Sequence, residues 1–164
     1  MSKQETIRQQ VSKNYAKAIT RPTSSGCCQP TEETSGCCSA PAPKGEVVKL
    51  AGYDEVSLKE LSPDTVSNSF GCGNPVAYSG VKPGDVVVDL GSGAGIDILI
   101  AAKKVGKDGR VIGVDMTDEM IARAEANISA AGLTNVEVRK GIIEELPVDS
   151  DSVDWVISNC VINL

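Results

Sequence analysis

Histidine is absent from the 164-residue sequence, and aromatic residues make up only 3% of it. Without imidazole, the chain offers no histidine base, no serine–histidine nucleophile and no histidine-ligated metal. Trp155 and Phe70 are the only residues of their types, too few to build the base-stacking surface of a single-stranded nucleic-acid binder. These absences exclude several common kinds of catalytic and binding site.

Long apolar runs and clusters of basic residues are also missing. No apolar run approaches the roughly 20 residues that a membrane span needs, and the first residues lack the apolar core of a secretory signal. Sixteen basic and 22 acidic residues give a formal net charge of −6, which disfavours phosphate backbones. We therefore expect a cytoplasmic monomer with one domain that binds neither nucleic acid nor membrane.

Large hydrophobic residues are missing from one internal stretch. Residues 20–46 contain no Val, Ile, Leu, Met or aromatic residue but hold four of the eight prolines. Such a stretch cannot offset an ordering cost of about 1–2 kcal/mol per residue, so we predict a flexible segment rich in Cys, Pro and Ser. Residues 1–19 carry an apolar stripe at helical spacing and predict a helix. Residues 47–164 form the main domain.

Strands and helices alternate in the main domain. Short apolar runs predict strands at Val86–Leu90, Val111–Asp115, Val136–Arg139 and Val153–Ser158. Helices are predicted for Gly95–Lys104 and between Thr117 and Gly132. This alternation is typical of an α/β fold with a doubly wound parallel sheet.

A glycine-rich loop directly follows the first strand, with the sequence Asp89-Leu90-Gly91-Ser92-Gly93-Ala94-Gly95. Its glycines allow a tight turn and let a ligand approach the backbone at the start of a helix. Asp115 ends the second strand, where a carboxylate can accept hydrogen bonds from ribose hydroxyls. The loop and this carboxylate together predict a nucleoside-containing cofactor.

The loop differs from the dinucleotide-binding fingerprint, and this difference indicates the identity of the cofactor. A dinucleotide fingerprint beginning at Gly91 needs a glycine at the position of Ile96, and Asp89 suits an ammonium group better than a pyrophosphate. S-adenosylmethionine fits these features, while a turn for NAD or for no cofactor is the alternative. We expect the adenine near Ile143 and Glu144; a solvated acidic turn is the other interpretation of Glu144.

Six cysteines stand out in this composition. Without an export signal they are expected to be reduced thiols, suited to soft-ion or redox chemistry. Cys160 follows the fourth strand, at the sheet end where ligands bind in open α/β folds. Cys72 lies in a glycine-flanked loop able to reach the same place. Cys160 as a small buried hydrophobe is the alternative.

Four motifs together resemble the microbial arsenite S-adenosylmethionine methyltransferases. They are Asn68-Ser69-Phe70-Gly71-Cys72-Gly73-Asn74-Pro75, the glycine loop, Gly113-Val114-Asp115-Met116-Thr117 and Ser158-Asn159-Cys160-Val161-Ile162-Asn163-Leu164. The resemblance implies the Rossmann-like fold of class I methyltransferases and an arsenic site at Cys72 and Cys160. It also implies that thioredoxin or small thiols restore trivalent arsenic and reduced cysteines. The cofactor-binding residues predicted from loop and resemblance together are Asp89, Gly91, Ser92, Gly93, Gly95, Asp115, Met116, Ile143, Glu144 and Asn159.

The implied chemistry agrees with the residue types. Trivalent arsenic is soft and prefers thiolates, and its lone pair can attack the methyl group of a sulfonium donor. No general base is needed, which suits a chain without histidine. Positioning alone can lower such a barrier by roughly 7–11 kcal/mol.

The sequence departs from the family pattern in its extent. The resemblance implies a seven-stranded sheet and a further arsenic-binding cysteine, whereas four strands are predicted before Leu164. We therefore expect the N-terminal part of a longer enzyme, or a truncated gene product, with weak cofactor binding and little or no turnover by itself. As an exposed edge, the fourth strand is expected to leave Trp155, Val156 and Ile157 without one covering layer.

Two questions stay open at this level. The pairs Cys27-Cys28 and Cys37-Cys38 lack zinc-site spacing; they either take part in arsenic capture or disulfide exchange, or belong to a passive tail. Two other functions compete with arsenite methylation: methylation of a small organic molecule, and thiol-based binding of arsenic or soft metals without catalysis.

Overall fold

The computed structural model describes residues 3–20, 51–53, 58–59, 61–69 and 73–162. The helices are α1 (Lys3–Thr20), α4 (Pro63–Ser67), α5 (Pro75–Tyr78), α6 (Ile96–Val105) and α7 (Asp118–Ala131). The strands are β1 (Val86–Leu90), β2 (Arg110–Asp115), β3 (Val136–Lys140) and β4 (Trp155–Ser158). The predicted N-terminal helix is thus present, while the segment 20–46 and its four cysteines lie almost wholly outside the described residues.

The four strands form one parallel sheet in the order β3-β2-β1-β4. The chain moves outward from β1 to β3 and then returns to the other side of β1, so a topological switch point lies between β1 and β4. The strand β4 begins at Trp155, two residues later than predicted. Its start is set by Asp154, whose carboxylate accepts a hydrogen bond from the Val86 amide (2.8 Å).

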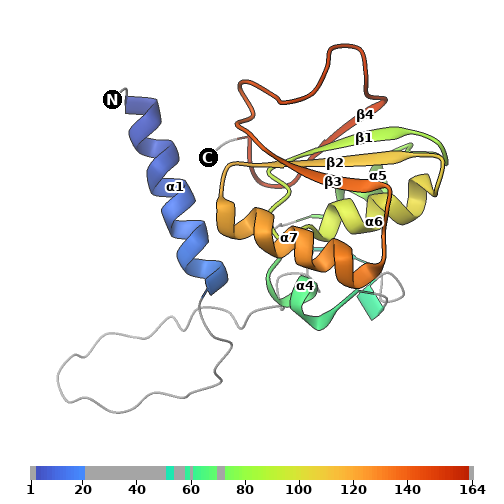
Figure 1. Ribbon diagram of the computed structural model, residues 1–164, viewed down its shortest axis with the longest axis horizontal. Coiled ribbons are helices and arrows are strands. Elements are labelled where there is room, and N and C mark those ends of the chain that lie inside the picture. The colour runs from blue at the N-terminus through green and yellow to red at the C-terminus, as the bar shows by residue number, and fades with distance from the viewer. Residues whose placement is uncertain (1–2, 21–50, 54–57, 60, 70–72, 163–164) are drawn as a thin grey trace.

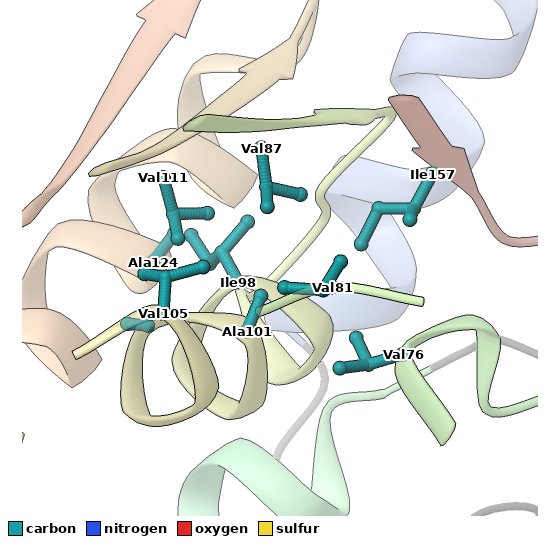
Figure 2. Close-up of a cluster of buried hydrophobic side chains, with 10 residues drawn as sticks. Val76, Val81, Val87, Ile98, Ala101, Val105, Val111, Ala124 and Ile157 are labelled. Carbon is teal, nitrogen blue, oxygen red and sulfur yellow. The ribbon is translucent and has the colours of Figure 1, made fainter. Parts of the chain in front are cut away.

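The main core lies between the sheet and α6. Val87, Val111 and Ile157 point from three neighbouring strands toward this helix (Figure 2). Ile98, Ala101 and Val105 of α6 fill the space beneath them and are fully buried. In Figure 1, α6 and α7 lie on the same side of the sheet. Burial of these apolar side chains stabilises the layer on which the site is built.

The opposite face of the sheet is covered by the connection between β3 and β4. Val148 and Val153 of this connection pack against Val88, Ile112 and Val114, and Figure 1 shows the connection arching away from the two helices. Within the described residues, a loop therefore covers the sheet face that a doubly wound fold fills with helices.

The edge strand β4 matches its prediction in part. Trp155 and Val156 are 36% and 54% exposed, as expected of an uncovered edge. Ile157 is only 5% exposed, so the expectation of a lost layer was wrong for this residue. Ile157 points to the helix side, where Val76 and Val81 cover it, while Val156 alternates to the opposite face.

The helix α1 stands beside the carboxyl ends of the strands (Figure 1). Its last turn is anchored because Ile19 packs against Ala94 and Met120, with Tyr15 alongside. Within the described part of the chain, no helix has the length and hydropathy needed to cross a membrane.

Candidate functional site

A cavity of about 160 Å³ opens at the carboxyl ends of β1, β2 and β4. One wall comes from the loops after these strands, and α1 contributes another through Ile7, Arg8, Val11 and Tyr15. Most of the predicted site residues line this cavity, and they are Gly91, Ser92, Gly93, Gly95, Asp115, Met116, Ile143, Glu144, Asn159 and Cys160. Open α/β sheets bind their ligands at this place.

The glycine loop is held against β2. The amides of Gly91 and Ser92 both donate to the carbonyl of Val114, at 2.8 and 3.1 Å. Gly91 has a φ of +71°, and a Cβ atom there would lie 2.5 Å from Val161. Glycine is therefore required by both conformation and space, and the loop presents bare backbone to the cavity.

Asp115 organises the backbone around it. One carboxylate oxygen accepts from the amide of Gly93 (2.9 Å) and the other from the amide of Thr117 (2.8 Å). Burial raises the pKa of Asp115, although these backbone hydrogen bonds oppose the shift. The carboxylate also lines the cavity, where it can accept further hydrogen bonds; that these come from ribose hydroxyls stays a prediction.

Two further carboxyl groups lie close to Asp115. Asp97 lines the cavity; Asp89 is 2% exposed, and its Oδ1 has no hydrogen-bond partner among the described residues. Burial and the neighbouring Asp97 and Asp115 raise the pKa of Asp89 well above its usual value. Such a group of acids favours a ligand with positive charge and disfavours a phosphate. This arrangement fits S-adenosylmethionine, which carries sulfonium and ammonium groups, better than a dinucleotide.

The predicted adenine end lies at the mouth of the cavity. Met116 and Ile143 line it with half-buried side chains. Glu144 is exposed and accepts a hydrogen bond from Arg8 of α1 at 2.6 Å, and this bond lowers the pKa of the Glu144 carboxyl. Glu144, the hydrogen-bond acceptor expected for the adenine amine, thus also links α1 to the rim of the cavity.

Cys160 lies on the rim with a backbone conformation that is rare outside glycine. Its φ is +60°, a conformation that costs about 1 kcal/mol or more and is common at functional sites. The sulfur is disulfide-bonded, which differs from the expectation of reduced thiols. An exposed thiol is open to oxidation and to exchange. Cys72, predicted as its partner on arsenic, lies outside the described residues.

A buried polar network stands behind Cys160. The Asn159 amide bonds both the N–H and the C=O of Gly73, and it also donates toward Asp97 and Tyr53. The Tyr53 hydroxyl donates to Asp97 at 2.8 Å. Sequence reasoning missed Tyr53 and Asp97. The one available signal was a single carboxylate among the otherwise apolar residues 96–102 of α6.

These features define an α/β protein with a nucleoside-cofactor site at the switch point of a parallel sheet. The chain belongs to the methyltransferase family whose model, described as a methyltransferase domain, matches residues 81–164.

Individual relatives are more specific than the family model. The chain is 43% identical, over 98% of its length, to an arsenite methyltransferase from Halobacterium salinarum. It is 37% identical, over 80% of its length, to an arsenite methyltransferase from Aquipseudomonas alcaligenes. These matches cover 41% and 38% of the respective relatives, so the chain spans about two fifths of their length.

A solved structure gives the same result. The crystal structure of an arsenic(III) S-adenosylmethionine methyltransferase from Chlamydomonas reinhardtii superimposes with a TM-score of 0.54 and 38% identity. The superposition covers 76% of this chain and 41% of that one. Fold and sequence therefore point to the same relatives.

Proposed function

We propose that this protein transfers methyl groups from S-adenosylmethionine to trivalent arsenic held by the thiolates of Cys72 and Cys160. The observation that carries the proposal is one cavity lined by the glycine loop, by Asp115 and by Cys160. A cofactor site and a candidate soft-ion ligand thus share one space, and the relatives named for arsenite methylation support this substrate.

The chain's own residues have distinct tasks in this proposal. The glycine loop and Asp115 hold and orient the methyl donor, and the buried acids favour its positive charge. Cys160, with Cys72, holds arsenic as a thiolate complex and leaves its lone pair facing the cavity. S-adenosylmethionine supplies an electrophilic methyl group when it is bound. Since no proton has to be removed from arsenic, a chain without a histidine base can carry out this transfer.

The disulfide at Cys160 adds a requirement for a reductant. A cysteine must be a free thiolate to bind arsenic, and Cys160 is oxidised here. A dithiol protein such as thioredoxin, or two small thiols, would take over the disulfide and return two protein thiols. This need is consistent with the predicted reducing, cytoplasmic location.

The test is a methyl-transfer assay with the reduced chain, arsenite, a thiol and labelled S-adenosylmethionine, run with protein in excess over arsenite. Slow transfer of label to arsenic is expected, and Cys160→Ser should abolish it. Label in a small organic acceptor would favour the competing methyltransferase function. Arsenic bound to the protein with no label transferred would favour thiol-based binding without catalysis.

A further inference from the structure

Asn159 makes an unusual double contact with one residue of a distant segment. Its Oδ1 accepts from the Gly73 amide at 3.2 Å, and its Nδ2 donates to the Gly73 carbonyl at 2.7 Å. The two residues are 86 positions apart in the sequence. The side chain thus pairs with both polar groups of Gly73, as a neighbouring strand would do.

The amide itself is held by two buried residues. Its Nδ2 lies 3.0 Å from Asp97 Oδ2 and 3.2 Å from the Tyr53 hydroxyl. Asp97 belongs to α6, and both Asp97 and Tyr53 are more than nine-tenths buried. The network therefore fixes the orientation of the Asn159 amide before any ligand is present.

The two residues joined in this way are the sequence neighbours of the two proposed arsenic ligands. Gly73 directly follows Cys72, and Asn159 directly precedes Cys160. We propose that Asn159 is a positioning residue whose amide joins the two cysteine-bearing segments and holds the two thiols within reach of one arsenic atom. This inference rests on the proposed function, because it presupposes that both thiols bind the same arsenic.

The physical benefit is preorganisation. A ligand that forms two bonds to one protein gains affinity when both groups are already near each other, because less freedom is lost on binding. Without the Asn159 amide, two hydrogen bonds between the segments disappear. The second As–S bond should then become weaker, while each thiol keeps its individual reactivity.

Phenylarsine oxide tests this directly, since it condenses with two thiols, forms two As–S bonds and releases one water. The assay uses the reduced full chain with Cys27, Cys28, Cys37 and Cys38 changed to Ser. In this background, Asn159→Ala should weaken phenylarsine oxide binding about tenfold or more. The alkylation rates of the two remaining thiols by iodoacetamide should change less than twofold.

The matched control is another asparagine that joins two segments. Asn135 Nδ2 donates to the carbonyls of Ala102 and Gly106 at 3.1 and 2.8 Å. Asn135→Ala should lower thermal stability as Asn159→Ala does but leave phenylarsine oxide affinity within about twofold. Equal affinity changes in the two variants, or no change in Asn159→Ala, would overturn the inference.

Two further measurements separate the possible failures. Cys160→Ser in the same background must lose the tight binding; if it does not, the proposed arsenic site is wrong. If Asn159→Ala does not fold, hydrogen exchange on the unmutated reduced chain decides. The Gly73 amide should exchange at least tenfold more slowly than in an unstructured peptide, and free exchange would overturn the inference.

Discussion

The two ends of the cavity are built in different ways. At the glycine-loop end, Asp115 bonds the amides of Gly93 and Thr117, which are 22 and two positions away. At the cysteine end, Asn159 bonds Tyr53, Gly73 and Asp97, which are 106, 86 and 62 positions away. One end is a local βαβ construction, and the other is assembled from three distant segments.

This difference shows which end of the cavity depends on local sequence and which depends on long-range contacts. A turn between adjacent elements follows from glycine, a strand end and a helix start, and such units recur in many proteins. A contact across 86 residues depends on the whole fold being in place. Under the proposed function, the cofactor end binds the methyl donor, whereas the cysteine end selects the acceptor.

The strongest way to break the glycine-loop end is Gly91→Ala. The new Cβ would lie 2.5 Å from Val161 in a backbone with a φ of +71°, so the loop must move. We expect S-adenosylmethionine affinity, measured by calorimetry, to fall by about 100-fold or more, together with a stability loss of about 2–3 kcal/mol.

Gly84→Ala is the matched control for that change. Its φ is +92°, but a Cβ atom there meets nothing within 4 Å. The backbone strain alone should cost about 1 kcal/mol and leave cofactor affinity unchanged. Equal losses of affinity in the two variants would mean that the loop does not contact the cofactor.

Cys160→Ser should affect ligand binding at the cysteine end of the cavity but not at the glycine-loop end. We expect the affinity for a trivalent arsenical to fall by about tenfold or more, because one of the two proposed soft ligands is lost. The affinity for S-adenosylmethionine should stay within about twofold. Fluorescence or calorimetric titrations of the reduced chain measure both, and a parallel loss of the two affinities would contradict independent ends.

Asp89→Asn tests the buried charge beneath the cavity. Because the folded state raises the pKa of Asp89, folding favours the protonated form, and stability falls as pH rises from about 4 through the raised pKa. Removing this ionisable group should raise stability at pH 7 by about 1 kcal/mol and flatten the pH dependence above pH 4. Urea unfolding between pH 4 and 8 measures both effects.

The control for Asp89→Asn is Asp108→Asn, which changes an exposed carboxyl in the turn before β2. It should change stability at pH 7 by no more than about 0.5 kcal/mol, as exposed substitutions usually do. If Asp89→Asn destabilises the protein at pH 7, the interpretation of Asp89 as an unfavourably buried acid is wrong.

The smallest effect is expected at the rim, from Arg8→Ala. The ion pair between Arg8 and Glu144 is exposed, and such pairs contribute little in water. Cofactor affinity should fall by no more than a few-fold, and the effect should diminish at high salt. Asp118→Ala, which removes the exposed Lys140 pair, should not change cofactor affinity at all.

Much of the fold could be predicted from the sequence because local patterns specify it. The apolar runs of β1 to β3 and the caps at Thr117 and Gly132 placed these elements within one or two residues. The buried Asn127, which donates to the Ala94 carbonyl at 2.9 Å, was missed, since a hydrophobic stripe does not reveal polar groups that find partners.

The candidate site could be predicted only at its local end. The glycine loop and Asp115 line the cavity as expected, because a strand followed by a glycine turn carries its geometry with it. The packing of α1 against the cavity could not be predicted, since the stripe of Ile7, Val11 and Tyr15 shows that a helix is amphipathic but not what it faces.

By itself, the sequence determined the parallel sheet, the loop after β1 and the acid after β2, because each arises from neighbouring residues and short-range geometry. Only the tertiary structure decided that Arg8 meets Glu144 and that Asn159 pairs with Gly73. Those contacts join segments more than 80 positions apart, and packing of the whole chain is what brings such segments together.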